Sequence, residues 1–154
     1  MANDNKFKVV ATNRFARHQY EILDTVEAGL VLMGTEIKSI RAGRVNIREA
    51  YARRSDTELW LHGAHIAQYE SASYNNHEPT RPRKLLLHRN QIDDLTLKAE
   101  SRGLTMVPLR LYIKNHRVKI EIGLARGRKH FDKRQAIAKR DADRRITQAI
   151  RRRD

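Results

Sequence analysis

Residues 105–124, with the sequence TMVPLRLYIKNHRVKIEIGL, hold the pattern that decides the fold. From Arg117 to Leu124 apolar and charged residues alternate, which is typical of a β-strand with one apolar face. Thr105 to Ile113 is a second strand-forming segment. Lys114-Asn115-His116 separates the two and predicts a turn, because Asn tolerates a left-handed backbone. The stretch therefore predicts an antiparallel hairpin.

Further strands are predicted on the N-terminal side of this hairpin. Val9 to Ala11 is a brief apolar segment, and Tyr20 to Leu32 alternates with a period of two over a long run. A strand resumes with Val45, Ile47 and Tyr51, and another covers Leu59 to Ile66, which contains the only tryptophan. The last two strands would be joined at Ser55-Asp56-Thr57. The apolar face of the long strand would consist of Tyr20, Ile22, Val26, Ala28, Leu30 and Leu32.

Helix signals are fewer. Thr12 or Asn13 can cap a short helix that ends near His18, since their side-chain oxygens accept unpaired backbone N–H groups. Residues 36–41 fit one or two helical turns. Residues 88–102 carry apolar side chains at helical spacing, and Gly103 follows where a C-terminal cap belongs. Residues 70–83 contain two of the three prolines and no apolar period, which predicts a surface loop.

Five or six strands and one helix of ordinary length, in a chain of 154 residues, predict a mainly β fold. A small antiparallel barrel is favoured because closure removes exposed sheet edges. The oligonucleotide-binding (OB) barrel is the commonest such architecture with a basic surface. We expect residues 1–124 to form this body and residues 125–154 to form a separate basic tail.

The charge is concentrated in that tail. Its 30 residues contain 12 Lys and Arg against 4 Asp, a formal charge of +8, whereas the first 124 residues contain 20 basic and 14 acidic residues, or +6. A net charge of +14 exceeds what solubility requires. It favours a polyanionic partner, with nucleic acid first, because cations that neutralise phosphates release condensed counterions.

The tail also carries a helix signal. Asp132 is followed three residues later by Gln135, which resembles a capping box. Beyond it Ala138, Ala142, Ile146 and Ile150 recur every four residues on one narrow stripe. So narrow a stripe cannot offset the entropy of ordering, and the arginine blocks repel one another. We therefore expect a tail that is disordered alone and helical when bound, the alternative being a solvated basic terminus.

Several classes of function lack support in the sequence. The absence of cysteine excludes a disulfide framework, a cysteine-ligated zinc site and a thiol nucleophile. His62 and His65 have no third ligand at motif spacing, so no metal site is expected. Asp93 and Asp94 would point about 100° apart on a helix. With no phosphate-binding loop or catalytic triad signature, we expect neither an enzyme nor a cofactor.

The N-terminus has no apolar core of signal-peptide length, and nowhere do about 18 apolar residues run consecutively. The sequence therefore predicts a cytoplasmic protein that does not span a membrane.

Five stretches, in order along the chain, resemble the SsrA-binding protein family, also called the small protein B family. They are ATNRFARHQYEI, VEAGLVLMGTEIKSIRAGRVNI, PTRPRKLLLHRNQI, LYIKNHRVKIEIGLARGRK and FDKR. The resemblance implies an OB-type body with flanking helices that binds the tRNA-like domain of transfer-messenger RNA. It also implies a function in trans-translation, the rescue of stalled ribosomes with peptide tagging, in which alanyl-tRNA synthetase and elongation factor Tu act on the same RNA.

By this resemblance, residues that grip the RNA match Asn13, Glu27 and Leu86. The carboxylate of Glu27 cannot contact phosphate favourably, so it would orient a basic neighbour or accept from a base edge or a 2′-hydroxyl. Leu86 is an apolar contact or a core residue, and the sequence favours core. The complete expected RNA-binding set is Asn13, Arg14, Arg17, His18, Glu27, Lys84 and Leu86.

For the tail, the resemblance implies entry into the small-subunit decoding centre and the empty messenger channel. Phe131 would stack on a base of ribosomal RNA. The expected contact residues are Gly127, Arg128, Lys129, Phe131, Asp132, Lys133, Arg134, Ile146 and Ile150.

Two other hypotheses fit parts of the sequence. A structural ribosomal protein would share a small barrel and a basic extension. An RNA-processing nuclease would use Asp93 and Asp94 as its carboxylate pair.

Overall fold

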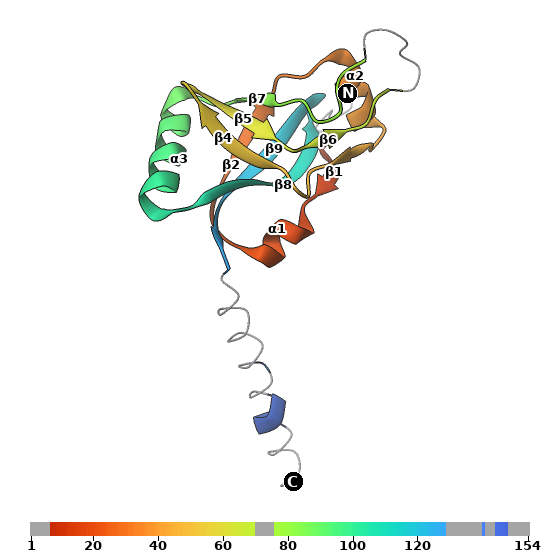
Figure 1. The fold of residues 1–154 in the computed structure, drawn as a ribbon. Coiled ribbons are helices and arrows are strands. Elements are labelled where there is room, and N and C mark those ends of the chain that lie inside the picture. The colour runs from red at the N-terminus through yellow and green to blue at the C-terminus, as the bar shows by residue number, and fades with distance from the viewer. Residues whose placement is uncertain (1–6, 70–75, 129–139, 141–143, 148–154) are drawn as a thin grey trace, which may run out of the picture.

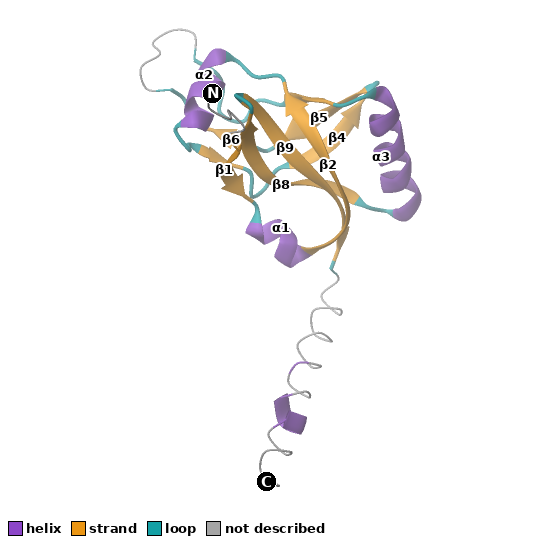
Figure 2. Cartoon of the chain, turned by 180° about the vertical axis from the view of Figure 1, so that it is seen from behind, coloured by secondary structure: helices purple, strands orange, loops and turns teal. Residues whose placement is uncertain are grey.

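The computed structural model describes residues 7–69, 76–128, 140 and 144–147. Strands dominate among the described residues, and helices α1, α2 and α3 lie around them (Figures 1 and 2). The elements in chain order are β1 (Phe7–Thr12), α1 (Arg14–Gln19), β2 (Tyr20–Leu30), α2 (Gly34–Arg41), β3 (Val45–Asn46), β4 (Tyr51–Ser55), β5 (Glu58–His62), β6 (His65–Ile66), β7 (Arg83–Leu86), α3 (Arg89–Arg102), β8 (Thr105–Lys114) and β9 (Arg117–Gly127).

Six strands close into a ring. The main sheet has the order β1-β8-β4-β5-β7-β2-β9, and β9 pairs again with β8. All these pairings are antiparallel, and β1 adds to the edge of β8 beyond the point where β4 pairs with it. Closure leaves few unpaired strand edges. The predicted mainly β fold, a ring of antiparallel strands with flanking helices, is confirmed.

The hairpin that decides the fold forms as predicted. β8 and β9 pair from Thr105↔Ala125 to Lys114↔Arg117. Asn115 and His116 both have left-handed backbones, with φ of 50° and 66°, which is the geometry of a two-residue hairpin turn. β9 runs on to Gly127 and buries Ala125 completely. The strand thus extends three residues past Leu124, the expected end of the body.

The long strand β2 ends at Leu30, two residues earlier than predicted. A bulge between Ile22 and Asp24 shifts its register against β9. Because of this shift, the predicted apolar face is divided between two clusters. Val26, Ala28 and Leu30 pack in the main core, and Tyr20 and Ile22 pack with Ala16 of α1.

The two strands predicted between residues 45 and 66 are each broken in two, which corrects that prediction. β3 and β6 pair with each other in a separate small sheet, while β4 and β5 belong to the ring. The first break is a turn in which Ala50 N–H donates to Ile47 O at 3.2 Å. The second is at Gly63, whose φ of +78° does not continue a strand.

The main core lies inside the ring, and helices cover its two ends. α3 contributes Ile92 and Leu95 at one end, and α2 contributes Ile40 at the other (Figure 1). Gly103 has the predicted left-handed cap conformation, with φ of 63°. Among the described residues no helix is long and apolar enough to cross a membrane.

The strand β7 was missed by sequence reasoning, which placed Arg83 in a surface loop. Arg83 and Leu85 point inward and are fully buried, while Lys84 and Leu86 point outward. A charged residue at an inward position hid the alternation. The correction has a physical reason, since the Arg83 guanidinium is paired with the equally buried carboxylate of Glu36 at 2.6 Å.

Little of the tail is among the described residues. Positions 140 and 144–147 are helical, and Ile146 is 59% exposed. The expected contacts Lys129, Phe131, Asp132, Lys133, Arg134 and Ile150 lie outside the described residues, as does the capping box.

Candidate nucleic-acid interface

Asn13 is the anchor of helix α1. Its Oδ1 accepts from the N–H of Ala16 at 3.0 Å, which is the predicted helix cap. Its Nδ2 donates to the backbone carbonyls of Pro108 at 2.9 Å and Ile47 at 3.1 Å. Asn13 is only 2% exposed. The amide is therefore buried and bonded to the protein, which suits a residue that positions α1 better than one that donates to RNA.

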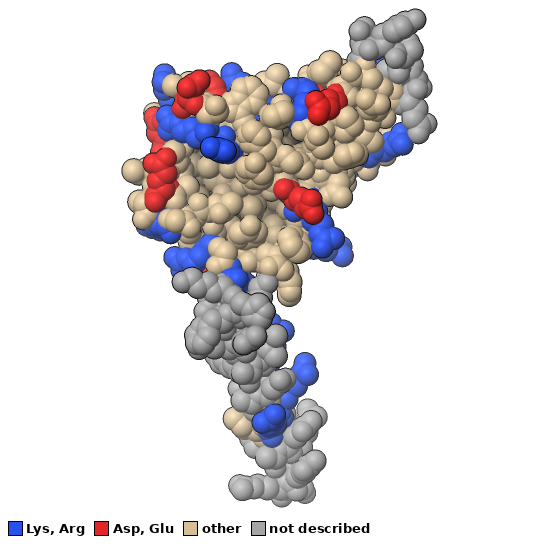
Figure 3. Space-filling model, in the orientation of Figure 1, with Lys and Arg blue, Asp and Glu red and all other residues tan. Residues whose placement is uncertain are grey.

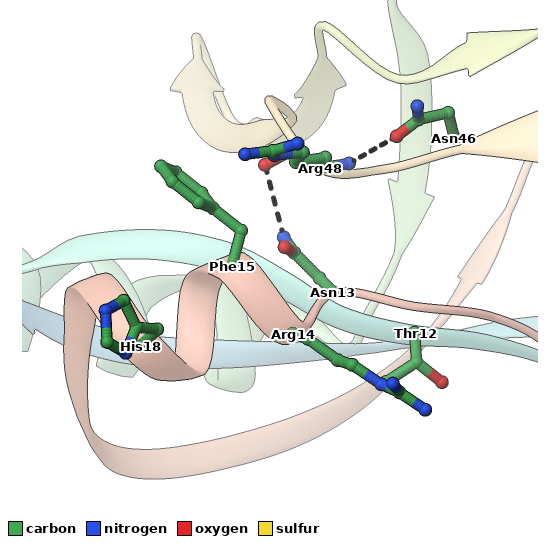
Figure 4. Close-up of a pocket in the computed structure, with 7 residues that line it drawn as sticks. All are labelled: Thr12, Asn13, Arg14, Phe15, His18, Asn46 and Arg48. Carbon is green, nitrogen blue, oxygen red and sulfur yellow. Dashed lines mark hydrogen bonds between the residues drawn. The ribbon is translucent and has the colours of Figure 1, made fainter.

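A small cavity lies beside α1, and Asn13 is one of the residues that line it (Figure 4). Arg14, Phe15 and His18 line it from the helix, and Asn46 and Arg48 line it from the segment after β3. The Arg48 guanidinium lies over the Phe15 ring at 4.7 Å from the centroid. Asn46 Oδ1 accepts from Arg48 N–H at 2.9 Å and fixes this segment. Two of the expected RNA contacts, Arg14 and His18, therefore meet here.

Glu27 occupies a different position, on the outer face of β2. Its carboxylate accepts a hydrogen bond from the hydroxyl of Tyr112 on β8, and Lys114 Nζ lies 3.6 Å away. The Tyr112 hydrogen bond, aided by Lys114 and Lys119, lowers the pKa of Glu27. Burial and the hydrogen bond to Glu27 raise the pKa of Tyr112. Glu27 is thus a carboxylate held in one orientation.

Leu86 lies next to Glu27 and is 50% exposed, so the preference for core was wrong. It pairs with Gly29 of β2, and the two residues line a hollow together with Glu27 and Lys119. A Cβ on Gly29 would lie 3.2 Å from Leu86 Cβ, so glycine makes room for the leucine to lie across the strand. An exposed leucine between a carboxylate and a lysine is suited to contact with the edge or face of a base.

Five of the seven expected RNA-binding residues thus line two separate hollows: Asn13, Arg14 and His18 beside α1, and Glu27 and Leu86 beside β2. Arg17 Nη2 lies 3.6 Å from Oε1 of Glu121 on β9. Because Glu121 lies directly opposite Glu27 on β2, Arg17 links the two groups of residues. Arg110 also pairs with Glu121, at 3.4 Å. These cations offset the repulsion between two facing carboxylates.

Lys84 points outward from β7 and lies 3.6 Å from Glu58. Gly127 ends β9, and Arg128 N–H donates to Gln19 O at 3.0 Å, so the beginning of the tail is bonded to the end of α1. Figure 3 shows Lys and Arg scattered mainly around the edges of this face of the body, with acidic side chains over α3 and also at other places on the face. On that helix Asp93 pairs with Arg54 and Asp94 with Lys98, each at 3.1 Å.

No group of three or more His, Cys, Asp or Glu side chains able to hold a metal occurs within the part of the chain that the structure describes. His62 stacks on Tyr51 with a centroid distance of 5.4 Å.

The family described as SmpB protein matches residues 10–152. The chain belongs to the SmpB family. An SsrA-binding protein from Chloroflexus aggregans is 56% identical over 97% of this chain and 95% of its own length. An SsrA-binding protein from Roseiflexus sp. strain RS-1 is 57% identical, with coverage of 99% and 98%.

A solved SmpB structure is also similar. It is described as "tmRNA-SmpB: a journey to the center of the bacterial ribosome". Its TM-score is 0.67 at 50% identity, over 80% of this chain and 86% of that one. The family suggested by the sequence motifs is therefore confirmed.

Sequence reasoning missed several residues of these two hollows in this SmpB family member. Lys119 was treated as a strand residue, although its outward position was evident from alternation. Tyr112, which donates to Glu27 of the second hollow, was also treated as a strand residue only. Phe15 and Arg48 are 33 positions apart in sequence and meet only in the folded chain, where Asn13 bonds α1 to the segment that carries Arg48. No local sequence signal could have paired them.

Proposed function

We propose that this chain is a non-enzymatic RNA-binding translation factor that binds the tRNA-like domain of transfer-messenger RNA and delivers it to stalled ribosomes for trans-translation. The observation that carries the proposal is the near-full-length similarity to relatives named SsrA-binding protein. The description of the similar solved structure, which joins tmRNA, SmpB and the ribosome, supports the same function.

In this proposal the body holds the RNA along the two hollows. Arg14, Arg17 and His18 contact phosphates or splayed bases, and Asn13 positions the helix that carries them. Glu27 is contacted by Tyr112 and Lys114 at Oε2. We assign its Oε1 to accept from a base edge or a 2′-hydroxyl, which suits a carboxylate that phosphate would repel. Leu86 supplies an apolar contact, and Lys84 adds charge beside it.

The tail has a separate role in this proposal. A segment with a formal charge of +8 suits a channel lined with ribosomal RNA, and intact messenger would obstruct it. We assign to the decoding centre and the messenger channel the residues Gly127, Arg128, Lys129, Phe131, Asp132, Lys133, Arg134, Ile146 and Ile150. Competition between tail and messenger would select stalled ribosomes.

The same function implies further partners and a location. Alanyl-tRNA synthetase charges an RNA with a tRNA-like acceptor, and elongation factor Tu carries charged RNA to the ribosome, so both would act on the bound complex. Work on ribosomes would place the protein in the cytoplasm.

Truncation after Gly127 tests whether the body binds RNA and the tail acts on the ribosome. The truncated chain is expected to bind the tRNA-like domain but to lose peptide tagging in a reconstituted translation system. A full-length chain with Asp132, Lys133 and Arg134 replaced by alanine serves as the matched control, since it keeps the length of the tail. Loss of RNA binding on truncation would contradict the two-part arrangement.

Sedimentation distinguishes the proposal from a structural ribosomal protein. A rescue factor is expected to be scarce on translating ribosomes and enriched on ribosomes stalled on truncated messenger. Equal amounts on both would favour the structural ribosomal protein.

A further inference from the structure

The cavity beside α1 contains an aromatic ring that packing does not explain. Ala16, the next residue, is buried against β8 and β9, whereas Phe15 points outward and is 40% exposed. His18 follows Phe15 by three residues and so lies on the same side of the helix, lining the same cavity. Two rings are thus presented to solvent on a helix with basic residues around them.

Arg48 completes this surface from another part of the chain. Its guanidinium lies on the Phe15 ring, and its backbone is tied to Asn46 and, through the Ile47 carbonyl, to Asn13. A planar guanidinium and an aromatic ring both stack on nucleobases. Arg14 supplies a second positive charge, and none of the described residues that line the cavity is acidic. The site therefore matches a flat, uncharged ring that is attached to phosphate.

We propose that Phe15, His18 and Arg48 form a stacking site for one unpaired base of the bound RNA, with Arg14 and Arg48 neutralising the flanking phosphates. This inference rests on the proposed function and adds the mode of recognition at α1. The base must be unpaired, because side chains cannot reach between the stacked bases of an A-form helix. Asn13 is a positioning residue for this site, since it fixes both the helix and the segment that carries Arg48.

Binding measurements on the full-length chain test the site. The probes are a transcript of the tRNA-like domain and a fully paired RNA duplex of equal length, each titrated at several salt concentrations. Phe15→Leu is expected to weaken binding of the transcript roughly 5- to 150-fold, the range for loss of one stacked base. The slope of log K against log salt should stay the same, and duplex binding should not change. Arg48→Gln is expected to weaken binding and to reduce the slope by about one.

Matched controls separate stacking from general effects. Tyr51→Leu removes an equally exposed aromatic outside the cavity, and Arg53→Gln removes one charge from strand β4. Tyr51→Leu should leave transcript affinity unchanged, and Arg53→Gln should leave the preference for transcript over duplex unchanged. Thermal unfolding of each variant confirms that the body remains folded.

Three results would overturn the stacking site. The first is a Phe15→Leu variant that binds the transcript as tightly as the wild type does. The second is a Phe15→Leu variant that loses as much affinity for the duplex as for the transcript. The third is a Tyr51→Leu variant that loses as much transcript affinity as Phe15→Leu does. A wild-type chain that bound the transcript no better than an unrelated RNA of the same length would instead contradict the proposed function, and with it the assignment of the base to this RNA.

Discussion

Glu36 and Arg83 form an ion pair in which neither side chain is exposed to solvent, with Arg83 Nε 2.6 Å from Glu36 Oε2. The carboxylate also accepts from Arg81 and, at 2.8 Å, from Met33 N–H. The remaining donors of Arg83 reach the carbonyls of Ala64 at 2.7 Å and Pro79 at 2.9 Å. A buried charge pair is tolerated only when its hydrogen bonds are satisfied, and here the bonds join α2 to β7 and to the segments beside them.

Removing one partner of this pair should therefore be costly. Arg83→Met is expected to lower the free energy of unfolding by about 3–5 kcal/mol, because it leaves an unpaired carboxylate in the interior. Urea denaturation measures the change. Lys84→Met is the matched control, since the neighbouring Lys84 makes a partly exposed pair with Glu58 that contributes about 0–1 kcal/mol. Similar losses in the two variants would contradict a special role for the buried pair.

Acid should weaken the contribution of the Glu36–Arg83 ion pair to stability. Burial raises the pKa of Glu36, but hydrogen bonds from Met33, Arg81 and Arg83 outweigh burial and bring the pKa below the ordinary value of 4.5. A folded-state pKa below the unfolded value contributes stability that is present above about pH 4.5 and lost as the pH falls through the folded pKa. The difference in unfolding free energy between the wild type and Glu36→Gln should therefore shrink below about pH 4.5. A difference that stays constant down to pH 3 would refute the linkage.

This ion pair is also an example of a contact that could not be predicted from the sequence. Strict alternation found the hairpin of β8 and β9, and a cap residue found α1, because each signal lies within a few neighbouring residues. Arg83 gave the opposite signal, since a charged residue at an inward strand position is explained only by Glu36, 47 positions away. The expected RNA contacts were similarly divided. Leu86 looked like core because its exposure depends on Gly29 across the sheet. The burial of Asn13 could not be predicted because its carbonyl partners are distant in sequence.

Two glycines with similar backbones should respond differently to alanine. Gly63 and Gly103 have φ of +78° and +63°, so alanine costs about 1–2 kcal/mol at either position for the left-handed backbone. At Gly63 the added Cβ would also lie 2.9 Å from the backbone oxygen of Glu49, whereas at Gly103 nothing lies within 4 Å. Gly63→Ala should therefore destabilise the protein clearly more than Gly103→Ala, as measured by urea unfolding. Equal losses would mean that the chain relaxes around Gly63.

The hydrogen bond between Tyr112 and Glu27 can be tested by titration. Tyr112→Phe should raise the pKa of the Glu27 carboxyl toward 4.5, because the Tyr112 hydroxyl is the main cause of its lowered value. The side-chain carboxyl resonance of Glu27, followed by NMR against pH, reports the shift. The cost in stability should be about 1 kcal/mol, since the carboxylate remains partly solvated. Tyr51→Phe should leave the Glu27 titration unchanged, and an unchanged titration in Tyr112→Phe would contradict the assignment.

Asn13 and Asn46 line the same cavity but use their side chains differently. Asn13 donates from Nδ2 to buried carbonyls, whereas Asn46 uses Oδ1 to accept from Arg48 N–H. An aspartate retains the acceptor and loses the donor. Asn13→Asp should therefore cost about 2 kcal/mol or more, because the Ile47 and Pro108 carbonyls lose a donor and face a buried negative charge. Asn46→Asp should stay within about 0.5 kcal/mol, since its hydrogen bond survives at an exposed position.

RNA binding by Asn13→Asp and Asn13→Gln separates positioning from contact. Asn13→Asp should loosen both α1 and the segment that carries Arg48, and transcript affinity should fall even under conditions where the variant is fully folded. Restoring a donor with Asn13→Gln would not rescue affinity, because the longer side chain cannot keep the cap to Ala16 and the bonds to Ile47 and Pro108 together. If the folded Asn13→Asp variant bound the transcript as tightly as the wild type, Asn13 would be a stability residue only, and the RNA contacts of α1 would not depend on the way this helix is anchored.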